Sequence, residues 1–319
     1  MSLIERAADM LGPVVPQSQR TPVVGEGPET LGPSLIQRAI SNDKQRSDFR
    51  TDKNLAEGEI VAPEPARAIG RVPRTLNIDL GKLRQQRMIT PDAERSPTSE
   101  SFRRIKRHII ANAANSRAGP GTNLVMITSA LPGEGKTYCT INLAMSIAME
   151  MDRTVLLVDA DVAKPSITAA LGIKVAAEQG LMDVLLRREI DVGDVICKTD
   201  IEKLSVLPAG TRHARATEAL ASEAMRALLQ EMAERYVDRI ILFDSPPLLA
   251  ASESCVLATC MGQILVVVEA GKTTETALKD ALSRIESSNV VGVLLNKGAA
   301  PGSGYGYGYG YGYGYGDSA

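Results

Sequence analysis

Six apolar segments of strand length recur between residue 123 and residue 300, and segments with helical patterns separate them. The apolar segments are 124–129, 154–160, 204–209, 239–245, 263–270 and 290–296. They are continuous rather than alternating, which is typical of parallel strands covered by helices on both faces. The pattern therefore predicts an α/β fold with a mainly parallel sheet and helices on both of its faces.

Composition fits one sizeable domain with an aliphatic core. Hydrophobic residues make up 44% of the 319 residues but aromatic residues only 3%, so Val, Ile, Leu, Ala and Met must fill the core. A formal net charge of −2 gives no global attraction to nucleic acid or acidic lipid. The four cysteines and two histidines lack metal-ligand spacing, which leaves little material for a zinc site or a Ser/His/Asp triad.

Composition also divides the chain into three parts. Residues 1–95 are rich in Pro, Gly, Gln and charge, and we expect a largely disordered extension with short amphipathic helices and no core. Residues 96–300 hold the α/β domain, and residues 301–319 are a low-complexity tail of Gly and Tyr that cannot bury a core. No apolar run approaches the roughly 18 residues that span a membrane, and the N-terminus lacks the apolar centre of a signal peptide. We expect a cytoplasmic protein whose membrane contact comes through a partner.

The domain is expected to open with a helix over 99–115. Thr98 or Ser99, just ahead of the acidic residue Glu100, is a usual signal for a helix N-terminus. Two further helices are expected over 138–151 and 217–236.

The first apolar segment runs into the sequence SALPGEGKT, and a helical pattern follows. Residues 130–137 fit the phosphate-loop pattern, although its first glycine is alanine here. Gly133 and Gly135 allow successive backbone N–H groups to turn toward phosphate oxygens, and Lys136 supplies a positive charge for the β- and γ-phosphates. The hydroxyl of Thr137 is suited to Mg²⁺. We therefore predict a P-loop NTPase fold whose ATP-binding residues include Pro132, Gly133, Glu134, Gly135, Lys136, Thr137 and Tyr138.

Acidic residues end two other predicted strands. Asp159 and Asp161 close the segment VLLVDAD, and Asp244 closes IILFD. Ligands of open parallel sheets bind beyond the carboxyl ends of the strands, where these acids fall. Mg²⁺ keeps several waters and needs only one or two carboxylates, which these three acids could supply.

The chain ends in GSGYGYGYGYGYGYGDSA, where six tyrosines alternate with glycine. They are Tyr305, Tyr307, Tyr309, Tyr311, Tyr313 and Tyr315. Only two other tyrosines, Tyr138 and Tyr236, occur in the chain. The phenol groups of this protein are therefore concentrated in its tail.

Together these motifs resemble the bacterial tyrosine kinase family over roughly residues 98–319. VLLVDAD matches its Walker A′ motif, ILFDSPP matches its Walker B motif, and the tail matches its tyrosine cluster. The resemblance implies that Lys136 binds the β/γ-phosphates and that Asp244 is the Walker B acid. It implies that Asp159 and Asp161 organise Mg²⁺ and its waters, and that one of them takes the proton of the incoming tyrosine. The Mg²⁺ ligands that it implies are Thr137, Asp159 and Asp244. The catalytic residues that it implies are Lys136, Asp159, Asp161 and Asp244.

Two further assignments come from the resemblance. Asn296 stands where related P-loop ATPases recognise adenine. The helix near residue 100 resembles the Glu-x-x-Arg-x-x-Arg helix through which such kinases form rings, with lysine in place of the second arginine. The oligomer-interface residues that it implies are Glu100, Arg103, Lys106 and Arg107.

The activity that the resemblance implies is MgATP-dependent autophosphorylation of the tail tyrosines between subunits, which would regulate exopolysaccharide polymerisation and export. It also implies a separate membrane-embedded activator (a polysaccharide co-polymerase), a cognate tyrosine phosphatase, and a place beside the inner membrane through that activator. The phrases MSLIERA and FRRIKRHIIANA resemble the subgroup found with exosortases.

Three alternatives are weaker. A partitioning or division-site ATPase of the same superfamily, a nucleotide-switched binding protein, would carry a signature lysine at the position of Leu131 and would lack a tyrosine tail. A dinucleotide-binding loop would need a third glycine at Tyr138. A Gly/Tyr tail that stacks on nucleic acid usually contains Arg or Lys, and none follows Lys297. We therefore expect no nucleic-acid partner.

Overall fold

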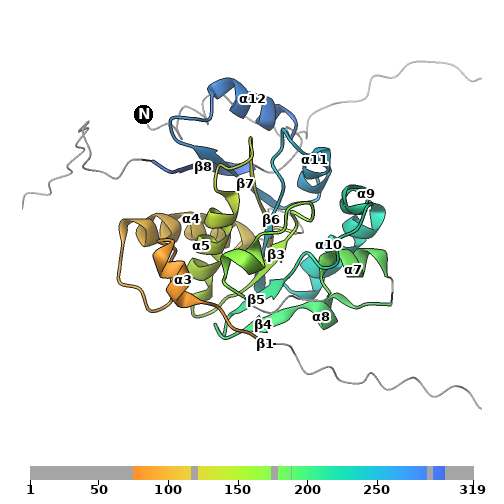
Figure 1. The fold of residues 1–319 in the computed structure, drawn as a ribbon, viewed down its shortest axis with the longest axis horizontal. Coiled ribbons are helices and arrows are strands. Elements are labelled where there is room, and N and C mark those ends of the chain that lie inside the picture. Colours follow the sequence, from red (N-terminus) through yellow and green to blue (C-terminus); the bar gives the residue numbers. More distant parts are fainter. Residues whose placement is uncertain (1–74, 116–120, 174–178, 188, 286–289, 299–319) are drawn as a thin grey trace, which may run out of the picture. The chain divides into compact units, whose positions relative to one another are not determined.

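An eight-stranded sheet forms the centre of the domain (Figure 1). The computed structural model describes residues 75–115, 121–173, 179–187, 189–285 and 290–298. The strand order is β1-β4-β5-β3-β6-β2-β7-β8, and all neighbours pair in parallel except β4 and β5. The strands are β1 (Thr75–Leu76), β2 (Leu124–Ser129), β3 (Thr154–Asp159), β4 (Cys197–Thr199), β5 (Leu204–Leu207), β6 (Arg239–Asp244), β7 (Gln263–Glu269) and β8 (Val290–Asn296). All six strands expected from the apolar segments are confirmed.

Helices cover both faces of the sheet. Figure 1 shows α3, α4 and α5 on one side and α9, α10 and α11 on the other. The buried apolar side chains accordingly form two clusters, and successive residues of the central strands belong to alternate clusters. The helices are α3 (Leu80–Gln85), α4 (Pro97–Ala114), α5 (Lys136–Ala148), α6 (Ile167–Ala170), α7 (Leu181–Leu186), α8 (Val192–Val195), α9 (Ala216–Leu220), α10 (Glu223–Arg235), α11 (Ser252–Ala258) and α12 (Glu275–Ser283).

Residues 75–95 belong to the domain, so the expectation that no core would appear before residue 96 is wrong for them. Leu76, Ile78, Leu83 and Ile89 are buried in the same cluster as α4 and α5. The Ile89 N–H donates to the side chain of Asn142 in α5 at 2.7 Å. In this segment, isolated apolar residues among polar ones pack into the core, so the sequence contains no apolar run there. Residues 1–74 lie outside the described residues.

The helix expected over 99–115 begins two residues earlier. Ser96 is its N-cap, and its hydroxyl accepts the N–H of Ser99 at 3.1 Å while the Ser99 hydroxyl accepts the N–H of Ser96 at 2.9 Å. Pro97 occupies the first helical position, where its missing N–H costs nothing. A reciprocal cap and a proline thus override the simpler Ser/Thr-before-Glu signal.

The helix expected over 217–236 is two helices, α9 and α10. Ser222 separates them as the N-cap of α10, where its hydroxyl accepts the N–H of Met225 at 3.3 Å. An apolar period that continues through both helices concealed this break, because the cap is a single small residue.

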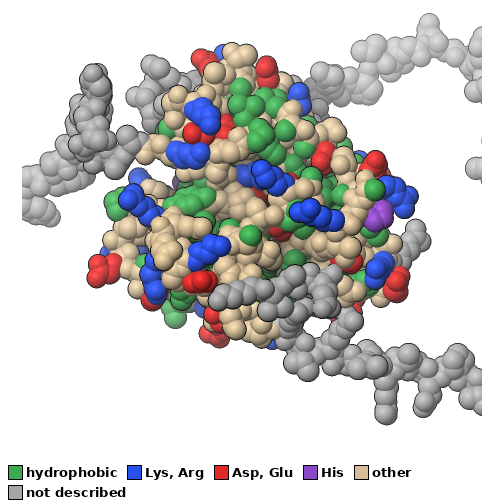
Figure 2. All heavy atoms as spheres, in the orientation of Figure 1, with side chains coloured by type: hydrophobic (Ala, Val, Ile, Leu, Met, Phe, Trp, Pro, Cys, Tyr) green, Lys and Arg blue, Asp and Glu red, His purple; other side chains and the backbone are tan. Residues whose placement is uncertain are grey.

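The sheet is less well covered at β8. This strand lies at the edge of the sheet, and Leu295 on it is 59% exposed. Figure 2 shows hydrophobic side chains gathered over the nearby helix α12. None of the described helices is both long enough and apolar enough to cross a bilayer.

The packing of residues 75–95 can be tested in α3. Leu83 is fully buried, whereas Gln85 of the same helix is exposed. We expect Leu83→Ala to lower the free energy of unfolding by about 2–4 kcal/mol, because it removes buried methyl groups and leaves a cavity. Urea denaturation of the full chain measures this effect. Gln85→Ala is the matched control, and equal stability of the two variants would show that α3 does not pack on the domain.

Candidate active site

The expected site residues meet at the carboxyl ends of three neighbouring strands. β3, β6 and β2 are consecutive in the sheet, and Asp159 and Asp244 are paired in register at the ends of the first two. The loop that follows β2 leads directly into α5. Parallel pairing therefore brings the phosphate loop and the predicted acids to one edge, as the sequence predicted.

The phosphate loop ends in an open helix N-terminus. Gly133 and Gly135 both have positive φ angles, of 85° and 93°. Gly135 is the N-cap of α5, and no side chain caps this end of the helix. The free N–H groups and the helix dipole make it suitable for phosphate oxygens.

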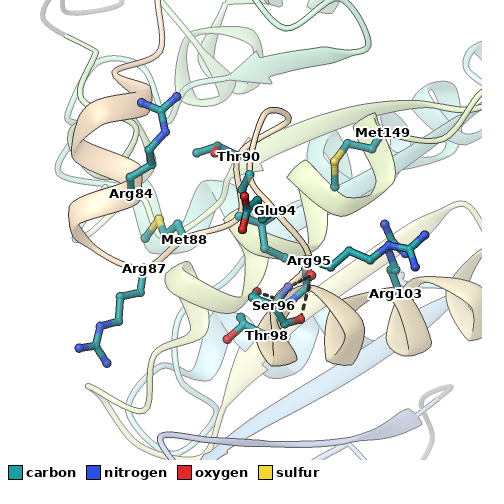
Figure 3. Close-up of a pocket in the computed structure, with 13 residues that line it drawn as sticks. Arg84, Arg87, Met88, Thr90, Glu94, Arg95, Ser96, Thr98, Arg103 and Met149 are labelled. Carbon is teal, nitrogen blue, oxygen red and sulfur yellow. Dashed lines mark hydrogen bonds between the residues drawn. The ribbon is translucent and has the colours of Figure 1, made fainter.

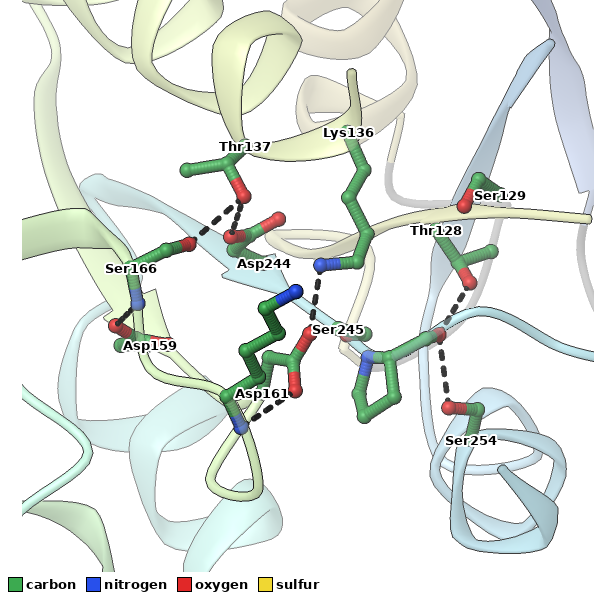
Figure 4. A network of polar contacts seen from close by, with 12 residues as sticks. Thr128, Ser129, Lys136, Thr137, Asp159, Asp161, Ser166, Asp244, Ser245 and Ser254 are labelled. Carbon is green, nitrogen blue, oxygen red and sulfur yellow. Dashed lines mark hydrogen bonds and ion pairs between the residues drawn. The ribbon is translucent and has the colours of Figure 1, made fainter. Parts of the chain in front are cut away.

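Thr137 connects the start of α5 with β6. Its hydroxyl donates to Asp244 Oδ2 at 2.7 Å and lies 3.0 Å from the hydroxyl of Ser166 (Figure 4). Thr140, one turn further along α5, donates to the other oxygen of Asp244 at 3.3 Å. Asp244 itself is fully buried. Burial raises its pKa to about 6, against the opposing effects of Lys136 and of the Thr137 hydrogen bond.

Lys136 is paired with Asp161. Its Nζ lies 2.7 Å from Asp161 Oδ2, and both side chains are largely buried. The other oxygen of Asp161 accepts the backbone N–H of Lys164 at 3.1 Å. Figure 4 shows Lys136 reaching across from α5 toward Asp161. This ion pair holds the ammonium group of Lys136 beside the phosphate loop.

One side-chain oxygen of Asp159 accepts hydrogen bonds, whereas the other has no partner among the described residues. Its Oδ2 accepts the N–H groups of Ser166 and Ile167, both at 3.0 Å. Its Oδ1 is buried and has no hydrogen-bond partner among the described residues. Burial raises the pKa of Asp159 to about 7, and the nearby charges of Asp244 and Asp161 act in the same direction.

The residues present fit Mg²⁺. Within the described part of the chain, no three His, Cys, Asp or Glu side chains form a ready-made metal cluster. Mg²⁺ does not need one, because it keeps several waters and binds through one or two carboxylates and substrate phosphates. The orphan Oδ1 of Asp159 and the Thr137 hydroxyl beside Asp244 are oxygen ligands of the right kind. A cation there would also relieve the cost of burying these carboxyl groups.

Three expected ATP-binding residues are engaged with the protein itself. The Glu134 side chain is buried, and its carboxylate accepts the N–H of Leu131 at 2.7 Å and bonds with the Thr273 hydroxyl. Tyr138 donates its hydroxyl to the carbonyl of Arg87 at 2.9 Å. Asn296 donates its amide to the carbonyl of Glu134 at 2.9 Å, so it contacts the loop backbone. Pro132 is exposed at the tip of the loop.

The expected interface residues of α4 divide into two groups. Glu100 and Arg103 form an ion pair of 3.2 Å on its outer side, and Arg107 is exposed. Lys106 is only 6% exposed, and its Nζ contacts the carbonyl of Ser146 at 2.7 Å and Glu150 at 2.6 Å. The ammonium group of Lys106 thus binds the end of α5 in the same chain, and its place in an interface stays a prediction.

Arg103 also borders a cavity of about 400 Å³ between α3, the segment after it and α4 (Figure 3). Arg84, Arg87 and Arg95 line the same cavity, and no residue of the phosphate loop does. The six tail tyrosines lie outside the described residues.

Sequence reasoning missed several contributors to the site. Ser166 contacts both Thr137 and Asp159, Thr140 holds Asp244, and Lys297 donates to the carbonyl of Gly133 at 2.8 Å. Thr140 lies one helical turn from Lys136, which is a usable signal. No pattern in one sequence distinguishes Ser166 or Lys297 from ordinary surface residues.

Comparison with known proteins agrees with this geometry. A family model described as an AAA domain matches residues 122–290. Tyrosine-protein kinase YwqD of Bacillus subtilis (strain 168) is 30% identical over 219 residues, 68% of this chain and 88% of that protein. The succinoglycan biosynthesis transport protein ExoP of Rhizobium meliloti (strain 1021) is 35% identical over 220 residues, 66% of this chain but 26% of that protein. The crystal structure of the chimerical protein CapA2B2 superposes with a TM-score of 0.56 and 27% identity, covering 70% of this chain and 93% of that one. The chain has an ATP-binding P-loop domain, and it belongs to the bacterial tyrosine kinase family.

Proposed function

We propose that this chain is an MgATP-dependent protein-tyrosine autokinase that phosphorylates the tail tyrosines, residues 305–315, of a second copy of itself. One observation carries the proposal. Lys136, Thr137, Asp159, Asp161 and Asp244 converge on one sheet edge, in a family of tyrosine kinases and in a chain that ends in six tyrosines.

The site residues suit phosphoryl transfer, which depends mainly on positioning and charge neutralisation. The N–H groups of the phosphate loop and the Lys136 ammonium hold the phosphates, while the Thr137 hydroxyl and Asp244 would hold Mg²⁺ together with Asp159. When bound, the cation supplies charge neutralisation at the β- and γ-phosphate oxygens. The carboxylates of Asp159 and Asp244 are already fixed by hydrogen bonds, so little reorganisation is needed.

The incoming tyrosine must lose its proton. Its phenol has a pKa near 10 in water, so a carboxylate must lie at the point of attack. Asp161 is paired with Lys136 in this structure. We propose that Lys136 turns to the phosphates when ATP binds, which leaves the Asp161 carboxylate without its partner. Asp159 is the alternative base.

The position of β8 supports transfer between subunits. β8 pairs in parallel with β7, so its carboxyl end lies at the nucleotide edge. The 14 glycine-rich residues 302–315 reach on the order of 20 Å as a coil and ~45 Å when extended. Those lengths suit a neighbouring site, whereas insertion into its own site would require a sharp reversal. We propose that Glu100, Arg103 and Arg107 join the neighbouring copies into a ring.

Relatives suggest the setting of this activity. The match covers only 26% of a succinoglycan biosynthesis transport protein, and the name of the chimerical protein CapA2B2 joins two components. We propose that a separate membrane-embedded co-polymerase activates this chain, holds it at the inner membrane and couples it to exopolysaccharide synthesis. A cognate phosphatase would reverse the modification. The N-terminal phrase MSLIERA supports the exosortase-associated subgroup.

Mixing two defective chains tests transfer between subunits. One chain carries Lys136→Met and keeps its tail; the other keeps Lys136 but lacks residues 301–319. We expect MgATP to place phosphotyrosine on the tail of the Lys136→Met chain, because its neighbour supplies the site. Mass spectrometry of the tail peptide measures the result, with and without the activator.

Two controls define the outcomes. The Lys136→Met chain alone should remain unmodified, and so should a mixture in which its six tail tyrosines are phenylalanine. An unmodified tail in the mixture, alongside a modified tail in the wild-type protein, would contradict transfer between subunits. No phosphotyrosine in the wild-type protein with activator would contradict the kinase itself.

The raised pKa of Asp159 predicts how stability depends on pH without Mg²⁺. The folded state keeps the proton up to about pH 7, whereas the unfolded state releases it near 3.8. The unfolded state therefore binds fewer protons between these values, and folding stability falls as the pH rises through them. Asp159→Asn removes this contribution while its side-chain oxygen still accepts the two N–H groups.

We expect Asp159→Asn to gain stability over the wild type as the pH rises from 5 to 8, by about 2–4 kcal/mol. Urea denaturation at several pH values in Mg²⁺-free buffer measures the difference. Parallel pH profiles for the two proteins would show that Asp159 is already ionised in the folded chain.

A further inference from the structure

We infer that Lys297, assisted by Asn296, is a positioning residue that turns the backbone N–H groups of the phosphate loop toward the nucleotide and so sets nucleotide affinity. The inference rests on the proposed nucleotide-binding role of that loop. It assigns a role to Lys297, at the junction between β8 and the tail, which the proposed reaction does not otherwise use.

Two side chains at the end of β8 hold two successive carbonyls of the phosphate loop. Lys297 donates from Nζ to the carbonyl of Gly133 at 2.8 Å, and Asn296 donates from Nδ2 to the carbonyl of Glu134 at 2.9 Å. Glu269 at the end of β7 fixes the lysine, with 3.1 Å between Oε2 and Nζ. The hydrogen bond from Lys297 also holds the pKa of Glu269 below its usual value.

The direction of these carbonyls determines the direction of the amides. In a planar trans peptide the C=O of one residue and the N–H of the next point to opposite sides, and the described chain has no cis peptide bonds. Holding the carbonyls of Gly133 and Glu134 toward β8 therefore turns the N–H groups of Glu134 and Gly135 away from β8. These N–H groups belong to the anion-binding concavity of a phosphate loop.

The close approach of β8 also explains a glycine. A Cβ atom at position 135 would lie 2.2 Å from Nδ2 of Asn296, closer than atoms can pack. Gly135 also has a φ of 93°, which L side chains rarely adopt. Glycine is thus required here both for the turn and for the contact with Asn296.

The loop needs such a brace because its tip is exposed. Leu131, Pro132 and Gly133 are all exposed, and the two glycines add conformational freedom. The buried carboxylate of Glu134 holds the loop from within through the N–H of Leu131. Lys297 holds it from outside, so that less ordering remains to be done when a phosphate binds.

Lys297 itself has a strained conformation that fits this role. Its φ is 57°, one of two positive values among the described residues other than glycine. This turn ends β8 and directs the lysine side chain back over the loop.

The chain offers a matched control in Lys272. Both lysines pair with Glu269, Lys272 at 3.3 Å and Lys297 at 3.1 Å, and both side chains are well exposed. Of the two, Lys297 contacts the phosphate loop. Loss of either lysine changes the charge beside Glu269 by the same amount, so a difference between the two variants isolates the contact with Gly133.

The experiment compares wild type, Lys297→Met, Lys297→Arg and Lys272→Met as full chains. MgADP affinity is measured by calorimetry, the KM for ATP and kcat from tail phosphorylation, and the melting temperature without nucleotide. We expect Lys297→Met to weaken MgADP binding and raise KM about five- to tenfold, the scale of one ordinary hydrogen bond, because this contact is exposed to solvent, with kcat changed less than about twofold. Lys297→Arg should recover most of the affinity, and Lys272→Met should match the wild type. Melting temperatures should stay the same.

Three results would overturn the inference. The first is an affinity of Lys297→Met for MgADP within twofold of the wild type. The second is a loss of MgADP affinity in Lys272→Met as large as in Lys297→Met. The third is an MgADP affinity of Lys297→Arg as low as that of Lys297→Met. The second result would assign the effect to the charge beside Glu269 and not to the Gly133 contact. If the wild-type chain itself binds no MgADP, the proposed function is wrong and the inference is wrong with it.

Discussion

The site depends on the hydrogen bonds that the buried carboxylate of Asp244 accepts. A carboxyl group with no exposed surface is costly unless it is hydrogen-bonded. Two hydroxyls of α5, those of Thr137 and Thr140, meet this need from one helical face. The same bonds fix the rotation of α5 against β6, and thereby the direction of its N-terminus and of Lys136. A group that costs stability in the free protein thus orients the parts that would bind MgATP.

Parallel pairing extends this arrangement across the sheet. β3, β6, β2, β7 and β8 all end at the same edge, so each contributes residues to one small region. β3 supplies the carboxyl group with an orphan oxygen, and β8 supplies the brace on the phosphate loop. Two ion pairs lie there, Lys136 with Asp161 and Lys297 with Glu269. The side chains that would bind phosphate and a cation are therefore already in position, and their present contacts can be exchanged for these ligands.

Most of the sheet and the acids at its edge were predictable from sequence, because both follow from local patterns. Buried parallel strands are continuous apolar runs, and the phosphate loop has a fixed spacing of Gly, Lys and Thr. Leu83, Lys106 and Lys297 were not predictable in their roles. Leu83 packs as a single apolar residue among polar ones, whereas the two lysines bind carbonyls 40 and 164 positions away. Contacts between distant polar groups leave no period in the sequence, so only the folded chain reveals them.

Charge relates the site to the tail in the proposed reaction. The unmodified tail is nearly neutral, so it can approach an edge that carries Asp159, Asp161 and Asp244. Each phosphate adds roughly −1.5 to −2 charge at neutral pH, and six would add about −9 to −12. In the proposed reaction a phosphorylated tail would be repelled by these acidic groups and attracted to basic surfaces such as the outer side of α4, where Arg103 and Arg107 lie. Because glycine separates all six tyrosines, none is sterically privileged, and the total charge rather than one site sets the strength of this repulsion.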